Sequence, residues 1–341
     1  MADGATAGVV TSPGTSVHEL VVRRVLSAYG VPESATITLL THSENATFAV
    51  DDPSGGPRSV LRVHRPGYHS LPAILSELDW VSALRAEGVV STAEVLPAVD
   101  GRRVVTVATP DGSVRHVVRF AWMSGQEPAG ERLVDDFRAL GAITATLHEH
   151  SRGWTPPPGF TRLRWDWNSS IGPHGHWGRW QDGLGVGATE RVVLGRLADL
   201  LRTRLATFGE GADRFGLIHA DMRLANLLVE PGVHGRPTVH VIDFDDCGFG
   251  WYLYDLGASL SFMEDDPRVP ELMAAWSLGY REVAALGPAE EAELETFVLL
   301  RRLLLVAWIG SHAETDLARG LGADFTRRSC DLAEGFLSRR G

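Results

Sequence analysis

An aspartate and an asparagine share the stretch LIHADMRLANLLV at 217–229, and a second aspartate follows in VHVIDFDD at 239–246. These residues are Asp221, Asn226 and Asp243. A carboxylate beside a substrate hydroxyl can orient it and accept its proton while a bond to phosphorus forms. Amide and carboxylate oxygens are hard ligands suited to Mg²⁺. The pattern therefore predicts phosphoryl transfer to a hydroxyl, with Asp221 taking the proton and Asn226 and Asp243 holding the metal.

Each of these residues, taken alone, has an ordinary structural explanation. Asp221 could cap a loop, Asn226 could occupy a turn, and 239–244 could be a buried strand. The whole pattern is far more specific than its parts, because two short strands and a Pro-Gly turn connect the loop to the second aspartate. We therefore favour the catalytic interpretation.

The two stretches resemble those of the aminoglycoside phosphotransferase family, which includes homoserine-kinase-type and choline-kinase-type small-molecule kinases. The resemblance extends over roughly 35–340 and is sharpest at 217–229 and 239–256. It implies a protein-kinase-like fold and the cofactors ATP and Mg²⁺. It also implies that His219 braces the catalytic loop and that Asp255 has a structural role.

Composition narrows the class of protein. The chain has 341 residues, of which 44% are hydrophobic, and a formal net charge of -11. Such an acidic chain lacks the basic stripe that nucleic acid demands. Its charge is compatible with a cationic substrate, although solubility alone is the better explanation.

Cysteine content and hydropathy bear on the cellular setting. Two cysteines, Cys247 and Cys330, are too few for a disulfide framework, which favours a reducing cytoplasm. The most apolar run, 297–309, is short and contains Arg301 and Arg302, so we expect no membrane-spanning segment.

The order of expected elements predicts an α+β fold with two lobes. A tail at 1–16 precedes an N-terminal nucleotide-binding lobe at 17–125, which has mainly antiparallel strands and one inserted helix at 70–87. A hinge is expected at 119–125. The catalytic and substrate-binding lobe, 126–341, is expected to be mainly helical, with helices at 188–208, 251–263 and 289–308 among others and a tryptophan-rich insert at 151–187.

The resemblance places the nucleotide in the first lobe. Arg62, in the strand-like run SVLRVH, occupies the position of the family's phosphate-binding lysine, and Glu77 is its candidate partner. An arginine can hold phosphate oxygens, but the two residue types are not interchangeable at such a site. The alternative for Glu77 is an exposed helix carboxylate. Ser43 and Asn45 lie in a polar turn that could contact phosphates.

Recognition of adenine is expected at the hinge, through backbone groups near Ala121 and Met123. Both could equally be ordinary residues at the end of a strand. The chain contains no Gly-x-Gly-x-x-Gly and no P-loop motif, which argues against a Walker-type ATPase.

Substrate choice is expected to depend on aromatic and acidic side chains of the second lobe. The candidates are Trp165, Trp167, Trp177, Trp180, Asp245 and Asp246. Aromatic rings on a loop can stack on a sugar or contact an amine through a cation–π interaction. The tryptophans could instead pack on one another as a small separate core. The two aspartates could serve a second metal, face a cationic substrate, or simply be solvated.

We therefore predict an ATP- and Mg²⁺-dependent kinase for a small, amine-bearing alcohol such as an amino sugar, homoserine or a choline-like compound. A serine/threonine protein kinase of the same fold is one alternative. It is disfavoured because the chain lacks a glycine-rich loop and an Ala-Pro-Glu-like anchor after Asp243. The other alternative is a nucleotide-binding regulatory module without turnover. Its only support is that Arg62 stands where the family has a lysine.

Overall fold

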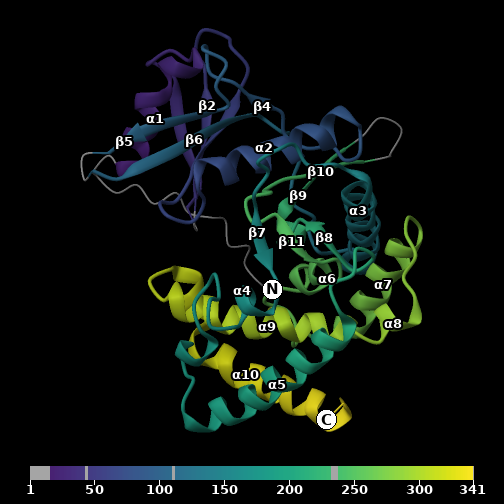
Figure 1. Ribbon diagram of the computed structural model, residues 1–341. Coiled ribbons are helices and arrows are strands. Elements are labelled where there is room, and N and C mark those ends of the chain that lie inside the picture. The colour runs from purple at the N-terminus through teal and green to yellow at the C-terminus, as the bar shows by residue number, and fades with distance from the viewer. Residues whose placement is uncertain (1–15, 43–44, 110–111, 232–236, 341) are drawn as a thin grey trace. The chain divides into compact units, whose positions relative to one another are not determined.

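The computed structural model describes residues 16–42, 45–109, 112–231 and 237–340. Contacts divide the chain into two compact units (Figure 1). The first comprises 1–71 and 95–122, and the second comprises 72–94 and 123–341. The chain therefore passes from one unit to the other between Trp122 and Met123, within the segment expected to be a hinge.

The first unit is a six-stranded antiparallel sheet with one helix. Its elements are α1 (Val17–Val25), β1 (Thr36–His42), β2 (Ala46–Asp51), β3 (Ser59–Val63), β4 (Val95–Leu96), β5 (Val104–Ala108) and β6 (Val114–Ala121). The strands lie in the order β1-β2-β3-β6-β4, and β5 also pairs with β6. Apolar residues of the strands, such as Phe48 and Leu61, share one buried core with Val22 of α1.

The second unit is mainly helical. Its longer helices are α2 (Leu71–Ala86), α3 (Leu133–Gly153), α5 (Ala188–Phe208), α7 (Val269–Arg281), α9 (Leu294–Ser311) and α10 (Asp316–Arg340). Its shorter ones are α4 (Trp167–Ser170), α6 (Tyr254–Ser259) and α8 (Pro288–Glu291). Helix α9 is buried at every position from Thr296 to Ile309 because α5, α6 and α10 all pack on it. No described helix has the length and apolar character needed to cross a bilayer.

Two small sheets of the second unit carry the loops of interest. The hairpin β9 (Leu227–Glu230) and β10 (Thr238–Val241) is antiparallel. A second sheet has the order β7-β11-β8, with β7 (Leu163–Trp165), β11 (Gly248–Trp251) and β8 (Phe215–Ile218). Of these strands, β11 lies close to α6 (Figure 1).

The predicted α+β architecture is confirmed, and several boundaries are corrected. The expected helix at 251–263 is wrong, because its start is strand β11 and the helix itself is Tyr254–Ser259. The expected single helix at 289–308 is two helices, α8 and α9. Strand β11 is rich in glycine, which is uncommon in strands, so its sequence does not indicate a strand. A Cβ on Gly248 would lie 2.4 Å from the carbonyl oxygen of Leu163, so the close approach to β7 requires glycine at this position.

Candidate active site

The loop after β8 brings Asp221 and Asn226 together. The Nδ2 atom of Asn226 donates hydrogen bonds to the carboxylate Oδ2 of Asp221 at 2.8 Å and to its main-chain oxygen at 2.7 Å. A short 3₁₀ turn, Leu224–Asn226, ends the loop and delivers the chain into β9. Because the amide nitrogen is committed to Asp221, the Oδ1 atom of Asn226 is the side-chain atom left to face a cation.

Two guanidinium groups face the Asp221 carboxylate. Nη2 of Arg301 lies 2.9 Å from Oδ1, and Nε of Arg223 lies 3.1 Å from the same oxygen. Burial alone would raise the pKa of Asp221, but the charges of Arg223 and Arg301 outweigh it and hold the pKa below its usual value. Asp221 is therefore ionised at neutral pH and can accept a hydrogen bond from a hydroxyl.

Asp255 anchors the backbone that leads to Asp221. Its Oδ1 accepts a hydrogen bond from the main-chain N–H of Ala220 at 2.7 Å, and its Oδ2 accepts one from the N–H of His219 at 3.2 Å. A third bond, at 3.0 Å, joins Oδ2 to Nε2 of His148, which is also buried. Ala220 has a φ of 66°, a left-handed conformation that this anchor helps to hold. Such contacts are what the resemblance implied for Asp255.

Replacing Asp255 with asparagine should destabilise the fold by about 3 kcal/mol, because an NH₂ group would then face one of three buried N–H donors. Urea unfolding followed by circular dichroism measures this loss. The matched control is Asp213→Asn, since the Asp213 side chain is 76% exposed and its surface ion pair contributes little. Equal stability of the two variants would show that Asp255 does not anchor the loop.

His219 ties the catalytic loop to the strand that precedes Asp243. Its Nδ1 accepts a hydrogen bond from the N–H of Asp221 at 3.3 Å, and its Nε2 donates to the carbonyl oxygen of Ile242 at 3.1 Å. The N–H of Ile242 in turn donates to the carbonyl oxygen of Asn226 at 3.0 Å. Burial lowers the pKa of His219, so the ring is neutral and can both accept and donate.

Asp243 is exposed at a sharp turn of the backbone. Its φ of 62° is left-handed, so the chain reverses locally and buries the next residue, Phe244. The Phe244 ring packs edge-on against Trp80, with 5.5 Å between ring centroids, and lies 4.6 Å from the ring of His219. The backbone hydrogen bond from Ile242 to Asn226 places the residue before Asp243 next to the loop that carries Asn226. A carboxylate and an amide oxygen form a hard donor set that fits Mg²⁺.

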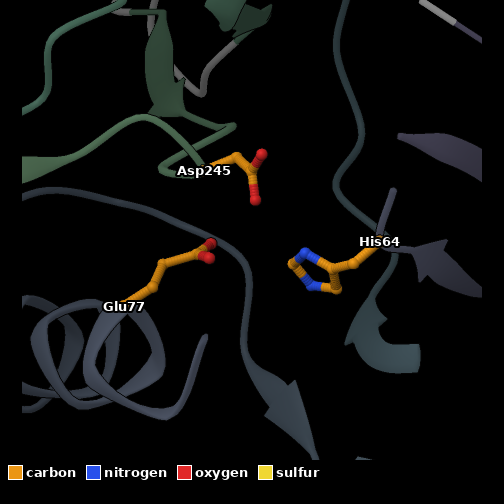
Figure 2. A group of neighbouring side chains, drawn as sticks. All are labelled: His64, Glu77 and Asp245. Atoms are coloured by element: carbon orange, nitrogen blue, oxygen red, sulfur yellow. The ribbon is translucent and has the colours of Figure 1, made fainter. Parts of the chain in front are cut away.

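Asp245 and Glu77 both belong to the second unit. Both are buried, and Figure 2 shows their carboxylates directed toward the same space, with an oxygen of each within 4.8 Å of the other. The burial of Glu77 excludes the alternative of an exposed helix carboxylate. Buried Arg162 compensates this negative charge and donates hydrogen bonds to the carbonyl oxygens of Cys247, Ala73 and Asp245. Cys247 is itself buried.

Asp246 has a different environment from Asp245. It is partly exposed, and its carbonyl oxygen accepts a hydrogen bond from Nε1 of Trp165 at 2.9 Å. Its negative charge acts on both Arg301 and Tyr254, which contact each other beside Asp221. Of the two aspartates, Asp246 is therefore the one that a solvated cationic substrate could reach.

The tryptophans of the insert pack mainly on the protein itself. Trp165, Trp177 and Trp180 are buried, whereas Trp167 is partly exposed. The ring of Trp165 stacks on Tyr254 and meets Trp177 edge-on, with centroid separations of 5.6 and 5.4 Å. Packing of the tryptophans on one another, one of the two alternatives raised by the sequence, therefore describes Trp165 and Trp177.

The nucleotide residues expected in the first unit lie on its strands and turns. Arg62 is buried in β3, with its guanidinium carbon 5.1 Å from the centroid of Phe120. The Oδ1 of Asn45 accepts a hydrogen bond from the N–H of Arg65 at 3.0 Å, which orients its side chain. Ala121 is the last residue of β6 and is partly buried. Met123, the first residue of the second unit's segment 123–341, is also partly buried. Ser43 lies outside the described residues.

Two residues that contact the Asp221 carboxylate were not among the predicted site residues: Arg301 and Arg223. The signal for Arg301 was present, because a charge in an otherwise apolar helix must find a partner when it is buried. In the sequence analysis, the two arginines of the run at 297–309 serve only to argue against a membrane-spanning segment. Arg223 lies within the motif itself. Its contact with Asp221 could not be predicted, because residues in a loop have no regular spacing that brings particular side chains together.

Known proteins provide an independent comparison. The model of the phosphotransferase enzyme family, APH, matches residues 36–286. Amicoumacin kinase of Bacillus subtilis (strain 168) is 25% identical over 84% of this chain and 83% of its own. The solved structure of a microcompartment-associated aminopropanol kinase is 51% identical, covers 94% of this chain and 98% of that chain, and has a TM-score of 0.88.

More distant structures share the fold. An amicoumacin kinase in complex with AMP-PNP, Ca²⁺ and Ami is 23% identical, covers 94% of this chain and 93% of that chain, and has a TM-score of 0.75. The match to the family model extends over more than half of the chain. The protein therefore belongs to the phosphotransferase enzyme family, as a small-molecule kinase with the protein-kinase-like α+β fold that its sequence predicted.

Proposed function

We propose that this protein transfers the γ-phosphate of ATP to the hydroxyl of a small amino alcohol of the aminopropanol type. The observation that carries the proposal is a pair of hydrogen bonds in the catalytic loop. Asn226 bonds to the carboxylate of Asp221, and Ile242, the residue before Asp243, bonds to the backbone of Asn226. The substrate class is supported by the 51% identity to the aminopropanol kinase.

ATP and Mg²⁺ are the proposed cofactors. Support comes from the amicoumacin kinase, whose structure contains AMP-PNP with Ca²⁺. Asn226 and Asp243 would hold the metal, and Arg62 would hold the phosphates with Glu77 as its candidate partner. The bound metal would neutralise charge on the phosphate oxygens. Backbone groups near Ala121 and Met123 are proposed to meet the adenine.

The chemistry assigned to this chain's own residues centres on Asp221. The acceptor hydroxyl donates a hydrogen bond to its carboxylate, which directs the oxygen lone pair at the γ-phosphorus. As the new O–P bond forms and the bond to ADP breaks, the hydroxyl proton passes to that carboxylate. The products are ADP and a phosphate monoester of the alcohol.

Asp246 is proposed to bind the ammonium group of the substrate. Asp246→Asn should raise the KM for aminopropanol about tenfold, since a hydrogen bond to a charged partner contributes about 1.5 kcal/mol, and leave kcat within about twofold. Steady-state kinetics at saturating Mg·ATP measure both constants. Asp245→Asn is a poor control because Asp245 is buried, so the exposed Asp199→Asn is preferred. An unchanged KM would assign the amine to another group.

The proposal is tested by ADP release in a panel of acceptors. The panel holds aminopropanol, ethanolamine, choline, homoserine, threonine, aminoglycosides and neutral sugars. We expect stimulation by small amino alcohols above all others. Stimulation by neutral sugars alone would contradict the amine, and transfer to a general protein substrate would favour the protein-kinase alternative. We also propose a cytoplasmic setting, which the two free cysteines support.

A further inference from the structure

Helix α9 carries a buried arginine whose guanidinium contacts the catalytic loop. Arg301 is 2% exposed, and each of its nitrogens has an acceptor. Nε donates to Oγ of Ser261 at 2.9 Å, and Nη1 to the hydroxyl of Tyr254 at 3.0 Å and to the carbonyl oxygen of Ala220 at 3.3 Å. Nη2 donates to Oδ1 of Asp221 at 2.9 Å.

Two of these contacts act on consecutive residues of the loop. One holds the carbonyl of Ala220, whose φ of 66° is unfavourable for a residue with a Cβ. The other holds the carboxylate of Asp221, whose second oxygen is fixed by Asn226. With one oxygen bonded to Arg301 and the other to Asn226, the carboxylate plane has a single orientation. The position of the helix matters too, because α6 approaches it closely at Gly257, where a Cβ would lie 2.4 Å from the carbonyl oxygen of Phe297.

The next residue, Arg302, provides the comparison. It is 1% exposed and also has four acceptors, but none belongs to the catalytic loop. Its partners are the carboxylates of Glu264 and Asp265, at 2.8 and 3.1 Å, together with Oγ of Ser329 and the carbonyl oxygen of Phe325. Burial and number of hydrogen bonds are therefore matched in two neighbouring arginines, and only the target differs.

We propose that Arg301 is a positioning residue for phosphoryl transfer, which sets the orientation of the Asp221 carboxylate toward the acceptor hydroxyl, whereas Arg302 serves stability alone. This inference rests on the proposed function of Asp221. A lysine retains the positive charge but offers one compact ammonium in place of a planar fork, so it cannot hold Ser261, Tyr254, Ala220 and Asp221 together. Arg301→Lys therefore separates geometry from charge.

The experiment compares Arg301→Lys with Arg302→Lys. For each folded variant, kcat, the KM for aminopropanol and the KM for ATP are measured, and stability is followed by urea unfolding. We expect Arg301→Lys to lower kcat by about 10- to 100-fold, since small displacements of a reacting group are costly, and to change either KM by less than about twofold. Arg302→Lys should lose at least as much stability and keep kcat within about twofold.

Two results would overturn the proposal. The first is a folded Arg301→Lys with wild-type kcat, and the second is an Arg302→Lys that loses kcat to the same extent. If Arg301→Lys does not fold, Tyr254→Phe decides, because it removes one partner of Arg301 and leaves the ring. A several-fold lower kcat supports positioning, and an unchanged kcat contradicts it.

A failure of the proposed function would look different. In that case the wild-type protein itself would not turn over aminopropanol. Crystal structures of the wild type and Arg301→Lys then test the inference without activity. A displaced Asp221 carboxylate or a changed Ala220 backbone in the variant supports positioning, and an identical loop in both structures overturns it.

Discussion

Replacing Asp221 with alanine is expected to lower kcat with aminopropanol about a thousandfold and to leave Mg·ATP affinity nearly unchanged. The reason is that no other group in the bonded loop can both orient the acceptor hydroxyl and take its proton. The proposed metal ligands, Asn226 and Asp243, remain in place. Arg301 would lose a partner for its buried charge, so some loss of stability accompanies the loss of turnover.

Asp221→Asn separates these two effects, because it keeps the shape of the side chain and removes its basicity. Turnover is measured by ADP release and nucleotide affinity by calorimetry. The exposed Asp199→Ala is the control for replacing a carboxylate elsewhere on the second unit. Near-normal kcat in a folded Asp221→Ala would refute the assignment of the base.

Replacing Asp243 with asparagine should weaken Mg·ATP binding about tenfold or more and lower turnover with it. The charged ligand is lost, whereas a neutral oxygen stays at the same position. Asparagine is chosen because it tolerates the left-handed backbone, for which φ is 62° here, better than alanine does. A change in stability is therefore not expected to obscure the change in binding.

The concentration of Mg²⁺ that gives half-maximal activity distinguishes a metal ligand from a merely structural aspartate. In Asp243→Asn this concentration should rise, and saturating Mg²⁺ should restore part of the activity. The Asp255→Asn variant is the comparison, since Asp255 acts on the backbone and not on the proposed cation. A metal requirement identical to that of the wild type would remove Asp243 from the ligand set.

Much of the fold follows from periodicity in the sequence. Apolar spacing at 70–87 and 188–208 marks helices that the structure contains at Leu71–Ala86 and Ala188–Phe208. Strand β11 could not be predicted in this way. Its glycines have low strand propensity, and the close contact with β7 that requires them is visible only once the chain is folded.

The site shows the same division between local and long-range information. Asp221 and Asn226 lie in one loop, so their spacing predicts their proximity, and a hydrogen bond joins them. Arg301 is 80 positions from Asp221, and only the packing of α9 against α6 brings it there. For the tryptophans, the residue type suggested contacts with a ligand. In the structure, Trp165 and Trp177 are buried and contact each other.

The most direct test of the account is the identity of the product. Wild-type protein and Asp221→Asn are incubated with Mg·ATP and aminopropanol, and the products are followed by phosphorus NMR and mass spectrometry. The account predicts an O-phosphate monoester of aminopropanol in amounts equal to ADP, which the variant does not form. Release of inorganic phosphate with unmodified aminopropanol, or equal ester formation by the variant, would contradict it.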